Sequence, residues 1–200
     1  MATSFIRTLR RLGKNYYTVA NLEKVFNLNR QSLLVALTRL VKRGELDRLA
    51  RGVYQLPNQS ISIPSIATQL YLPSYISFEW ALSRHGIVSQ IPYTITLATI
   101  KKPKKMIIRD IPCEYRHLKP ELFFGFTLKD EMYIADPEKA LLDQLYLVSK
   151  GREVLDLEAL DLKMIKKPIF CKYIQKYPKS TRKLARTLIS SVGKSSISVK

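Results

Sequence analysis

The chain is short of acidic residues, cysteines and long apolar runs. Its 200 residues include 34 Lys and Arg but only 16 Asp and Glu, for a formal net charge of +18 at pH 7. Two cysteines cannot form a disulfide framework, which agrees with a reducing compartment. No stretch approaches the roughly 20 apolar residues of a membrane span, and we find no export signal. We therefore expect a cytoplasmic protein with no membrane partner.

Histidine and glycine are also scarce, with two and seven residues respectively. No glycine-rich phosphate loop and no Ser-His-Asp or Cys-His signature is visible. A structural zinc site needs four ligands at compact spacing, and only Cys113 and His117 are close in sequence. We expect no metal, no cofactor and no enzymatic activity.

A third alternative is an enzyme that acts on nucleic acid, which would need a cluster of acidic residues. Asp136 and Glu138 are explained by the start of a helix, in which Asp136 caps the free amides and Glu138 lies in the first turn. Only Asp143 then remains, and a divalent-metal site needs more than one carboxylate.

The positive charge is concentrated at the two ends of the chain. Residues 1–58 hold 11 basic and 3 acidic residues, and residues 163–200 hold 11 basic and none acidic. The segment between them holds 12 basic and 13 acidic residues and is nearly neutral. Such an excess of cations predicts a polyanionic partner, most often nucleic acid, although a basic run can also simply solvate a surface.

The sequence divides near Pro57 to Ser60, a polar stretch that follows a strand-like run. With 46% apolar residues, the chain can form a core on each side of this point. We predict a small domain over residues 1–58 and a larger one over residues 59–200.

Three helices are predicted in the first domain, over residues 4–12, 19–26 and 30–43. Asn29 is a suitable N-cap for the third helix and Gly44 a suitable stop. Its helical spacing predicts a buried stripe of Leu33, Leu34, Leu37, Leu40 and Val41. In the first two helices, the expected buried residues include Leu12 and Val25.

A β-hairpin follows, with strands at 46–49 and 53–56 and a turn that contains Gly52. Three helices followed by a two-stranded wing are typical of the winged helix-turn-helix, whose third helix enters the DNA major groove. The side chains expected to contact DNA come from the third helix and the wing: Arg30, Gln31, Val35, Thr38, Arg39, Lys42, Arg48 and Arg51. The alternative is a winged helix used only for protein contacts.

The second domain has the pattern of a mixed α+β fold. Helices are predicted at 77–85, 137–149, 160–166, 170–176 and 181–191, and strands at 93–99, 113–118, 123–128 and 132–135. The last predicted helix has Ser180 as its N-cap. The basic C-terminal tail offers a partner-binding surface at Lys172, Lys176, Lys179, Arg182, Lys183 and Arg186.

Three segments, in this order, resemble the AbiEi antitoxins, which are the regulatory halves of type IV toxin-antitoxin operons of abortive phage infection. They are Arg-Gly-Val-Tyr-Gln-Leu-Pro at 51–57, Tyr-Ile-Ser-Phe-Glu-Trp-Ala-Leu-Ser-Arg-His-Gly at 75–86, and Ile-Ala-Asp-Pro-Glu-Lys-Ala-Leu-Leu-Asp at 134–143. No segment is specific alone, and the likeness extends over about residues 5–150.

The resemblance implies a repressor of its own operon, acting through an N-terminal winged helix, and an antitoxin domain that counters a nucleotidyltransferase-like toxin. It also implies promoter DNA with inverted repeats, bound by two copies of a chain that we expect to be a monomer in solution. It assigns no antitoxin residues. The alternatives are a transcription regulator without an antitoxin role, and a basic adaptor whose tail docks on RNA or on an acidic toxin surface.

Overall fold

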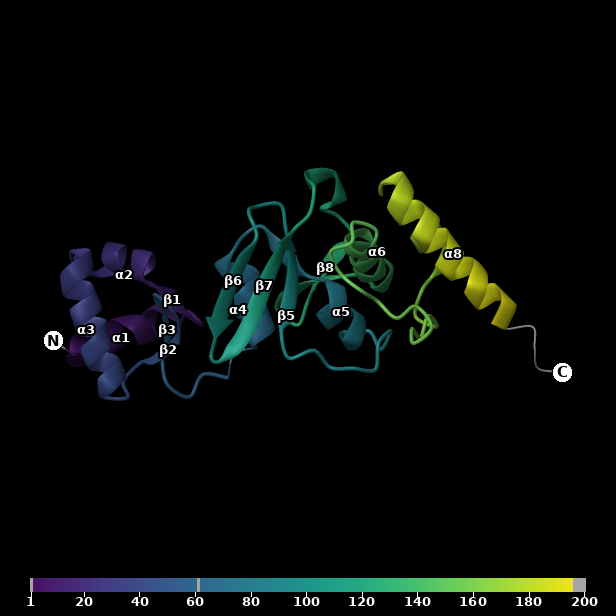
Figure 1. Cartoon of the computed structure of the whole chain (residues 1–200). Coiled ribbons are helices and arrows are strands. Elements are labelled where there is room, and N and C mark those ends of the chain that lie inside the picture. The colour runs from purple at the N-terminus through teal and green to yellow at the C-terminus, as the bar shows by residue number, and fades with distance from the viewer. Residues whose placement is uncertain (1, 61, 196–200) are drawn as a thin grey trace. The chain divides into compact units, whose positions relative to one another are not determined.

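The structure is a computed structural model that describes residues 2–60 and 62–195 (Figure 1). These residues form two compact units. The first comprises Met1–Ile63 with Met106–Asp110, and the second comprises Pro64–Lys105 with Ile111–Lys200. None of the described helices combines the length and the apolar character needed to cross a membrane.

The first unit has three helices and a small antiparallel sheet, and Figure 1 shows the sheet beside the helices. Its strands lie in the order β1-β3-β2, with β3 in the centre. The predicted helices and hairpin are confirmed. The elements are α1 (Ala2–Leu12), β1 (Tyr17–Thr18), α2 (Val19–Phe26), α3 (Arg30–Lys42), β2 (Asp47–Ala50) and β3 (Val53–Gln55).

One apolar core holds this unit together. Leu9, Leu22, Leu33 and Leu37 are fully buried in it, and they come from all three helices. The Tyr17 hydroxyl donates to the carbonyl of Leu9 at 2.6 Å, so β1 is tied to α1 by a buried hydrogen bond. The core therefore fixes which face of each helix is turned outward.

Three residues predicted to be buried in this unit are exposed: Leu12 on α1, Val25 on α2 and Leu34 on α3. Leu34 follows Gln31 by three residues, and Thr38 follows it by four. At 3.6 residues per turn, this spacing places Leu34 on the outer face of α3, beside the polar residues.

The second unit is a mixed α+β structure, which confirms the predicted class. Its strands have the order β7-β5-β4-β9-β8, with parallel pairs β5/β7 and β4/β9, and β6, whose residues from Met106 onward belong to the first unit, follows β7 in the strand order. Helix α6 packs against α5, α7 and α8. The elements are α4 (Ile63–Leu70), β4 (Ser74–Ile76), α5 (Phe78–Arg84), β5 (Ile95–Thr99), β6 (Lys104–Ile108), β7 (Ile111–His117), a 3-10 turn (Pro120–Leu122), β8 (Phe126–Lys129), β9 (Met132–Ala135), α6 (Pro137–Val148), α7 (Lys167–Ile174) and α8 (Lys179–Ser195).

Elements α4, β4 and β6 were not predicted. Strand β4 has three residues, all buried, so it lacks the alternation of polar and apolar residues that marks a half-exposed strand. Strand β6 begins with two exposed lysines, and α4 carries no charged residue in either terminal turn. Each is too short for periodicity to identify it.

The helix predicted at 160–166 is wrong. Asp161 accepts a hydrogen bond from the backbone N–H of Lys163 at 3.0 Å, which forms a turn in place of the first helical turn. Ser180 does not cap α8 either. The helix starts earlier, because the amide of Arg182 donates to the carbonyl of Pro178 at 2.9 Å.

Candidate nucleic-acid interface

Helix α3 is defined by its end caps. The side chain of Asn29 accepts from the amide of Ser32 at 2.8 Å, as predicted for the N-cap. At the other end, Gly44 has a φ of +69°, and the amides of Gly44 and Glu45 donate to the carbonyls of Val41 and Leu40 at 3.0 and 2.9 Å. This is the glycine-terminated helix end expected at Gly44.

A short turn joins α2 to α3, and Asn27 controls it. Asn27 lies at φ 48° and ψ 39°, the left-handed region, in which side chains other than Gly and Asn are strained. The turn runs through Asn27, Leu28 and Asn29, and so has the three-residue length of a helix-turn-helix corner. Asn27 thus stands where many such turns have glycine.

We expect Asn27→Val to lower the free energy of unfolding by about 1–3 kcal/mol, because a β-branched side chain is strained at positive φ. Asn27→Gly should change it by less than about 1 kcal/mol. Urea denaturation followed by circular dichroism measures both. Asn15→Val is the matched control, since Asn15 is exposed and its φ is not positive. Equal stability of the two valine variants would contradict the strain.

The outward face of α3 forms an open hollow of about 400 Å³. It is lined by Gln31, Leu34, Val35, Thr38, Arg39 and Lys42. All six side chains are exposed, so the residues that sequence analysis assigned to base reading on α3 are accessible on one surface. Leu34 is the member of this surface that sequence analysis placed in the core.

The hollow combines positively charged, polar and apolar side chains. Arg39 and Lys42 carry positive charge, Gln31 offers an amide, and Val35 offers methyl groups. The Thr38 hydroxyl donates to the carbonyl of Leu34 at 2.8 Å, which orients it back along the helix while the residue stays exposed. This set matches the groups that bind phosphates, adenine edges and thymine methyls.

Three further predicted residues lie outside the hollow. Arg30 pairs with Glu23 at 3.1 Å, so its charge is partly neutralised. In the hairpin, the Arg48 Nε donates to the carbonyl of Ala50 at 3.5 Å, and Arg51 is exposed in the turn between β2 and β3. The structure therefore gathers five of the eight predicted residues in the hollow, leaves Arg30 at the start of α3 outside it, and leaves two on the hairpin.

The acids of this segment do not cancel the charge of the hollow. Glu23 faces Arg30 at 3.1 Å, Glu45 lies 4.0 Å from Arg43, and Asp47 accepts from Gln55 at 3.1 Å. Within the described chain, Arg39 and Lys42 have no such carboxylate beside them. Their charges remain available to an anionic partner.

The predicted tail residues lie on and around the last two helices. Lys172 is on α7, Lys176 follows that helix, and the other four are on α8. All are exposed except Arg182, which is half-buried. Lys176 Nζ lies 4.1 Å from the ring centre of Phe124, a cation–π contact. Lys200, at the end of the basic tail, lies outside the described residues.

A buried ionic cluster joins the segments at residues 75–86 and 134–143 of the second unit. Asp143 Oδ2 accepts from the hydroxyls of Tyr75 at 2.9 Å and Ser77 at 2.7 Å. Asp143 Oδ1 binds the ammonium of Lys139 and accepts from the Tyr177 hydroxyl at 2.7 Å. The side chains of Lys139 and Asp143 are fully buried. This cluster, closed to solvent, links β4 and the start of α5 to α6 and to the residues after α7.

Burial sets the ionisation of this cluster. It lowers the pKa of Lys139, an effect that the neighbouring Asp143 opposes. It also raises the pKa of Tyr75 and Tyr177 well above the usual value, and Asp143 adds to that rise. Both hydroxyls therefore stay protonated and keep donating to Asp143.

The other two acids of the segment at residues 134–143, Asp136 and Glu138, also form hydrogen bonds within the protein. Asp136 stands at the N-cap of α6, but its side chain makes no capping hydrogen bond and instead accepts from the Tyr173 hydroxyl at 2.9 Å. Glu138 accepts from the amide of Lys166 at 2.7 Å. The predicted helix start is correct, whereas both acids bind the segment after residue 160. Within the described residues, no three His, Cys, Asp or Glu side chains are grouped to hold a metal ion.

Comparison with known families bears on the first unit. Residues 5–57 match the family described as "Transcriptional regulator, AbiEi antitoxin". This match confirms the resemblance to AbiEi antitoxins over residues 5–57, from within α1 to beyond β3, and it does not extend to the segments at 75–86 and 134–143. No curated protein matches the chain.

Proposed function

We propose that the first unit is a winged helix-turn-helix that represses the chain's own operon. Helix α3 enters the major groove of promoter DNA, and the β2–β3 hairpin is the wing. The proposal rests on one observation above all, the accessible hollow of α3, in which Arg39 and Lys42 form no ion pair with any described residue. The order α2, turn, α3 and hairpin supports it, as does the family match over the same residues.

We expect different residues to recognise DNA bases and to contact the DNA backbone. We expect Arg39→Ala to lower discrimination at one base pair of the operator by about 1–3 kcal/mol. Arg51→Ala should weaken all sequences alike, because a wing-tip arginine reaches the backbone or the minor groove. Fluorescence anisotropy on the operator and on single-base variants measures both.

Arg84→Ala is the matched control for these two variants. It also removes one exposed arginine, which lies in the second unit and pairs only at its surface with Asp130 at 3.7 Å. Operator affinity should not change in this control. Uniform weakening by Arg39→Ala, without a change in base preference, would contradict its role in reading bases.

We further propose that the chain counters a nucleotidyltransferase-like toxin and that the exposed cations of α8 take part, by docking on RNA or on an acidic surface of the toxin. The support is the resemblance together with the exposed Lys183 and Arg186. The engaged acids Asp136, Glu138 and Asp143 support a role without catalysis.

The double variant Lys183→Glu/Arg186→Glu should lose at least about tenfold of growth rescue when the toxin is co-expressed, because like charges repel at a docking surface. Operator binding by the same variant should persist. Lys102→Glu/Lys129→Glu is the control, since both lysines are exposed and neither belongs to α8. Full rescue by the α8 variant would contradict the tail's role.

A further inference from the structure

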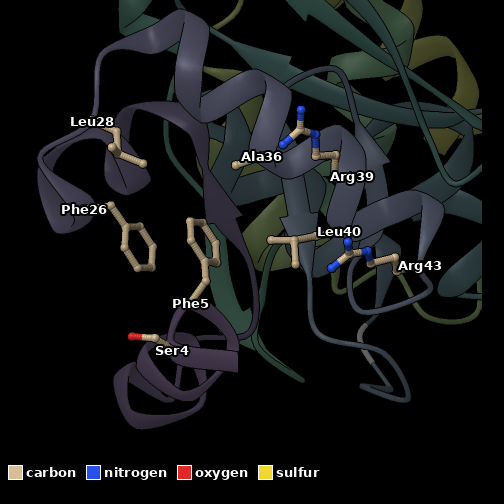
Figure 2. A pocket seen from close by; sticks show the side chains of 8 residues that line it. All are labelled: Ser4, Phe5, Phe26, Leu28, Ala36, Arg39, Leu40 and Arg43. Atoms are coloured by element: carbon tan, nitrogen blue, oxygen red, sulfur yellow. The ribbon is translucent and has the colours of Figure 1, made fainter. Parts of the chain in front are cut away.

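The first unit contains a second hollow, a pocket of about 390 Å³ beside the core. Helices α1, α2 and α3 and the turn after α2 build it. Figure 2 shows the Phe5 and Phe26 rings on one side and the Arg39 and Arg43 side chains on the other. The lining residues are Ser4, Phe5, Phe26, Leu28, Ala36, Arg39, Leu40 and Arg43.

Much of the wall of this pocket is apolar, and its apolar side chains pack against one another and against the core. Phe5 and Phe26 stack with ring centres 3.7 Å apart, and Leu40 is buried in the core. Leu28 is 40% exposed, so the pocket carries apolar surface open to a ligand. The volume lies at the lower end of the range of small-molecule sites, which suits a ligand of about 10–15 non-hydrogen atoms.

Among the described residues, the lining of the pocket includes two arginines and no acidic residue. Arg39 and Arg43 are four residues apart on α3 and at its C-cap, so they lie on one side of the helix. Arg43 reaches Glu45 only at 4.0 Å, and Arg39 faces no acid in the described part of the chain. Guanidinium groups in the wall of an apolar cavity complement a carboxylate attached to an apolar body.

We propose that this pocket binds a small organic carboxylate with an aromatic or aliphatic body, and that the bound acid weakens operator binding. The apolar body would lie against Phe26 and Leu28, and the carboxylate would pair with Arg39 and Arg43. The second half of this proposal rests on the proposed function of α3.

Arg39 provides the link between ligand and DNA, because it lines both the pocket and the outer hollow. A carboxylate that holds the guanidinium in the pocket withdraws one cation from the DNA-facing surface. By linkage, DNA must weaken the binding of the acid by the same factor that the acid weakens the binding of DNA. For the loss of one arginine contact, we expect about a 10-fold to 100-fold change.

Binding to the free protein is tested first, with 4-phenylbutyrate and its neutral amide as probes. Isothermal titration calorimetry should give a Kd below about 1 mM for the acid and at least about tenfold weaker binding for the amide. Arg43→Gln should remove this preference for the acid. Ala36→Leu should narrow the pocket and weaken both probes, while its melting temperature shows whether it folds. Arg84→Gln is the charge-matched control and should bind like the parent chain.

The proposal that the pocket binds an organic carboxylate would be overturned by equal affinity for the acid and the amide. It would also be overturned if neither phenylbutyrate nor octanoate gave heat at about 5 mM. An acid preference that persists in Arg43→Gln would overturn its assignment to these arginines. Binding that requires a second copy of the chain, seen as acid-dependent dimerisation by sedimentation, would overturn the small-molecule site in favour of an interface.

Operator binding is then measured with and without saturating acid. The acid should weaken it by about 10-fold or more in the parent chain and have no effect in Arg43→Gln, which lies outside the outer hollow. Unchanged DNA affinity in the presence of bound acid would overturn the coupling and leave the pocket standing. A chain that binds the acid but no operator would overturn the proposed function alone.

Discussion

Lys139→Met should destabilise the second unit by about 3–5 kcal/mol, because it leaves the fully buried Asp143 without its cation. Tyr75, Ser77 and Tyr177 would still donate to the carboxylate, but no other basic side chain among the described residues forms an ion pair with it. Equilibrium unfolding in urea, followed by circular dichroism, measures the loss.

The double variant Lys139→Met/Asp143→Leu separates the cost of an orphaned charge from the value of the pair. It should recover most of the lost stability, since buried ion pairs are often replaced by apolar residues at little cost. Lys163→Met is the surface control. Its pair with Asp161 at 3.1 Å is exposed, and its loss should cost less than about 1 kcal/mol. A Lys139→Met chain as stable as the control would contradict the charge-balance argument.

Raising the salt concentration fourfold should weaken operator binding about a thousandfold, if about six phosphates are neutralised. The physical reason is the release of counterions from DNA when the cations of the first unit replace them. Eleven basic residues stand against three acidic ones over residues 1–58, so enough cations are present for six contacts. Anisotropy titrations at several salt concentrations give the slope of log affinity against log salt.

Single variants refine the salt prediction. Lys42→Ala should reduce the slope by about 1, because one phosphate contact is lost, whereas Arg84→Ala should leave it unchanged. A slope near zero for the parent chain would remove phosphate contact from the proposed mechanism. The outer hollow of α3 would then be better explained as a surface for protein contacts.

The sequence was most informative where local chemistry decides the structure. Asn29 and Gly44 mark the two ends of α3 through their own hydrogen bonds and backbone angles, so they can be identified without knowledge of the rest of the fold. The outward residues Gln31, Val35, Thr38 and Arg39 follow from the same periodicity. Their exposure agrees with the prediction, while their contact with DNA stays a prediction.

Leu34 shows where residue type misleads. A leucine next to Leu33 invites assignment to the core, yet the helical spacing from Gln31 and Thr38 places it on the outer face. The angle around the helix decides burial here, and hydrophobicity does not. Leu34 adds an apolar group to the centre of the candidate DNA surface.

The buried cluster as a whole could not be predicted, because the hydroxyls that bind its Lys139–Asp143 pair come from distant parts of the chain. Ser77 lies 66 residues before Asp143, and Tyr177 lies 34 residues after it. The Asp-Pro-Glu-Lys segment reads locally as a helix start, which is correct, but its acids and its lysine bind partners that only the tertiary fold brings close. No local pattern distinguishes a capping acid from one that binds a distant tyrosine.

Tyr173 and Tyr177 have a consequence for work with shortened chains. Both hydroxyls bind acids of the α6 motif, and Phe170, Ile174 and Leu188 from the same C-terminal region are buried. A chain cut after Gly151 would lose these side chains and open the Lys139–Asp143 pair to water. Loss of rescue in such a deletion would report a damaged core, so the basic surface of α8 has to be studied in the full-length protein.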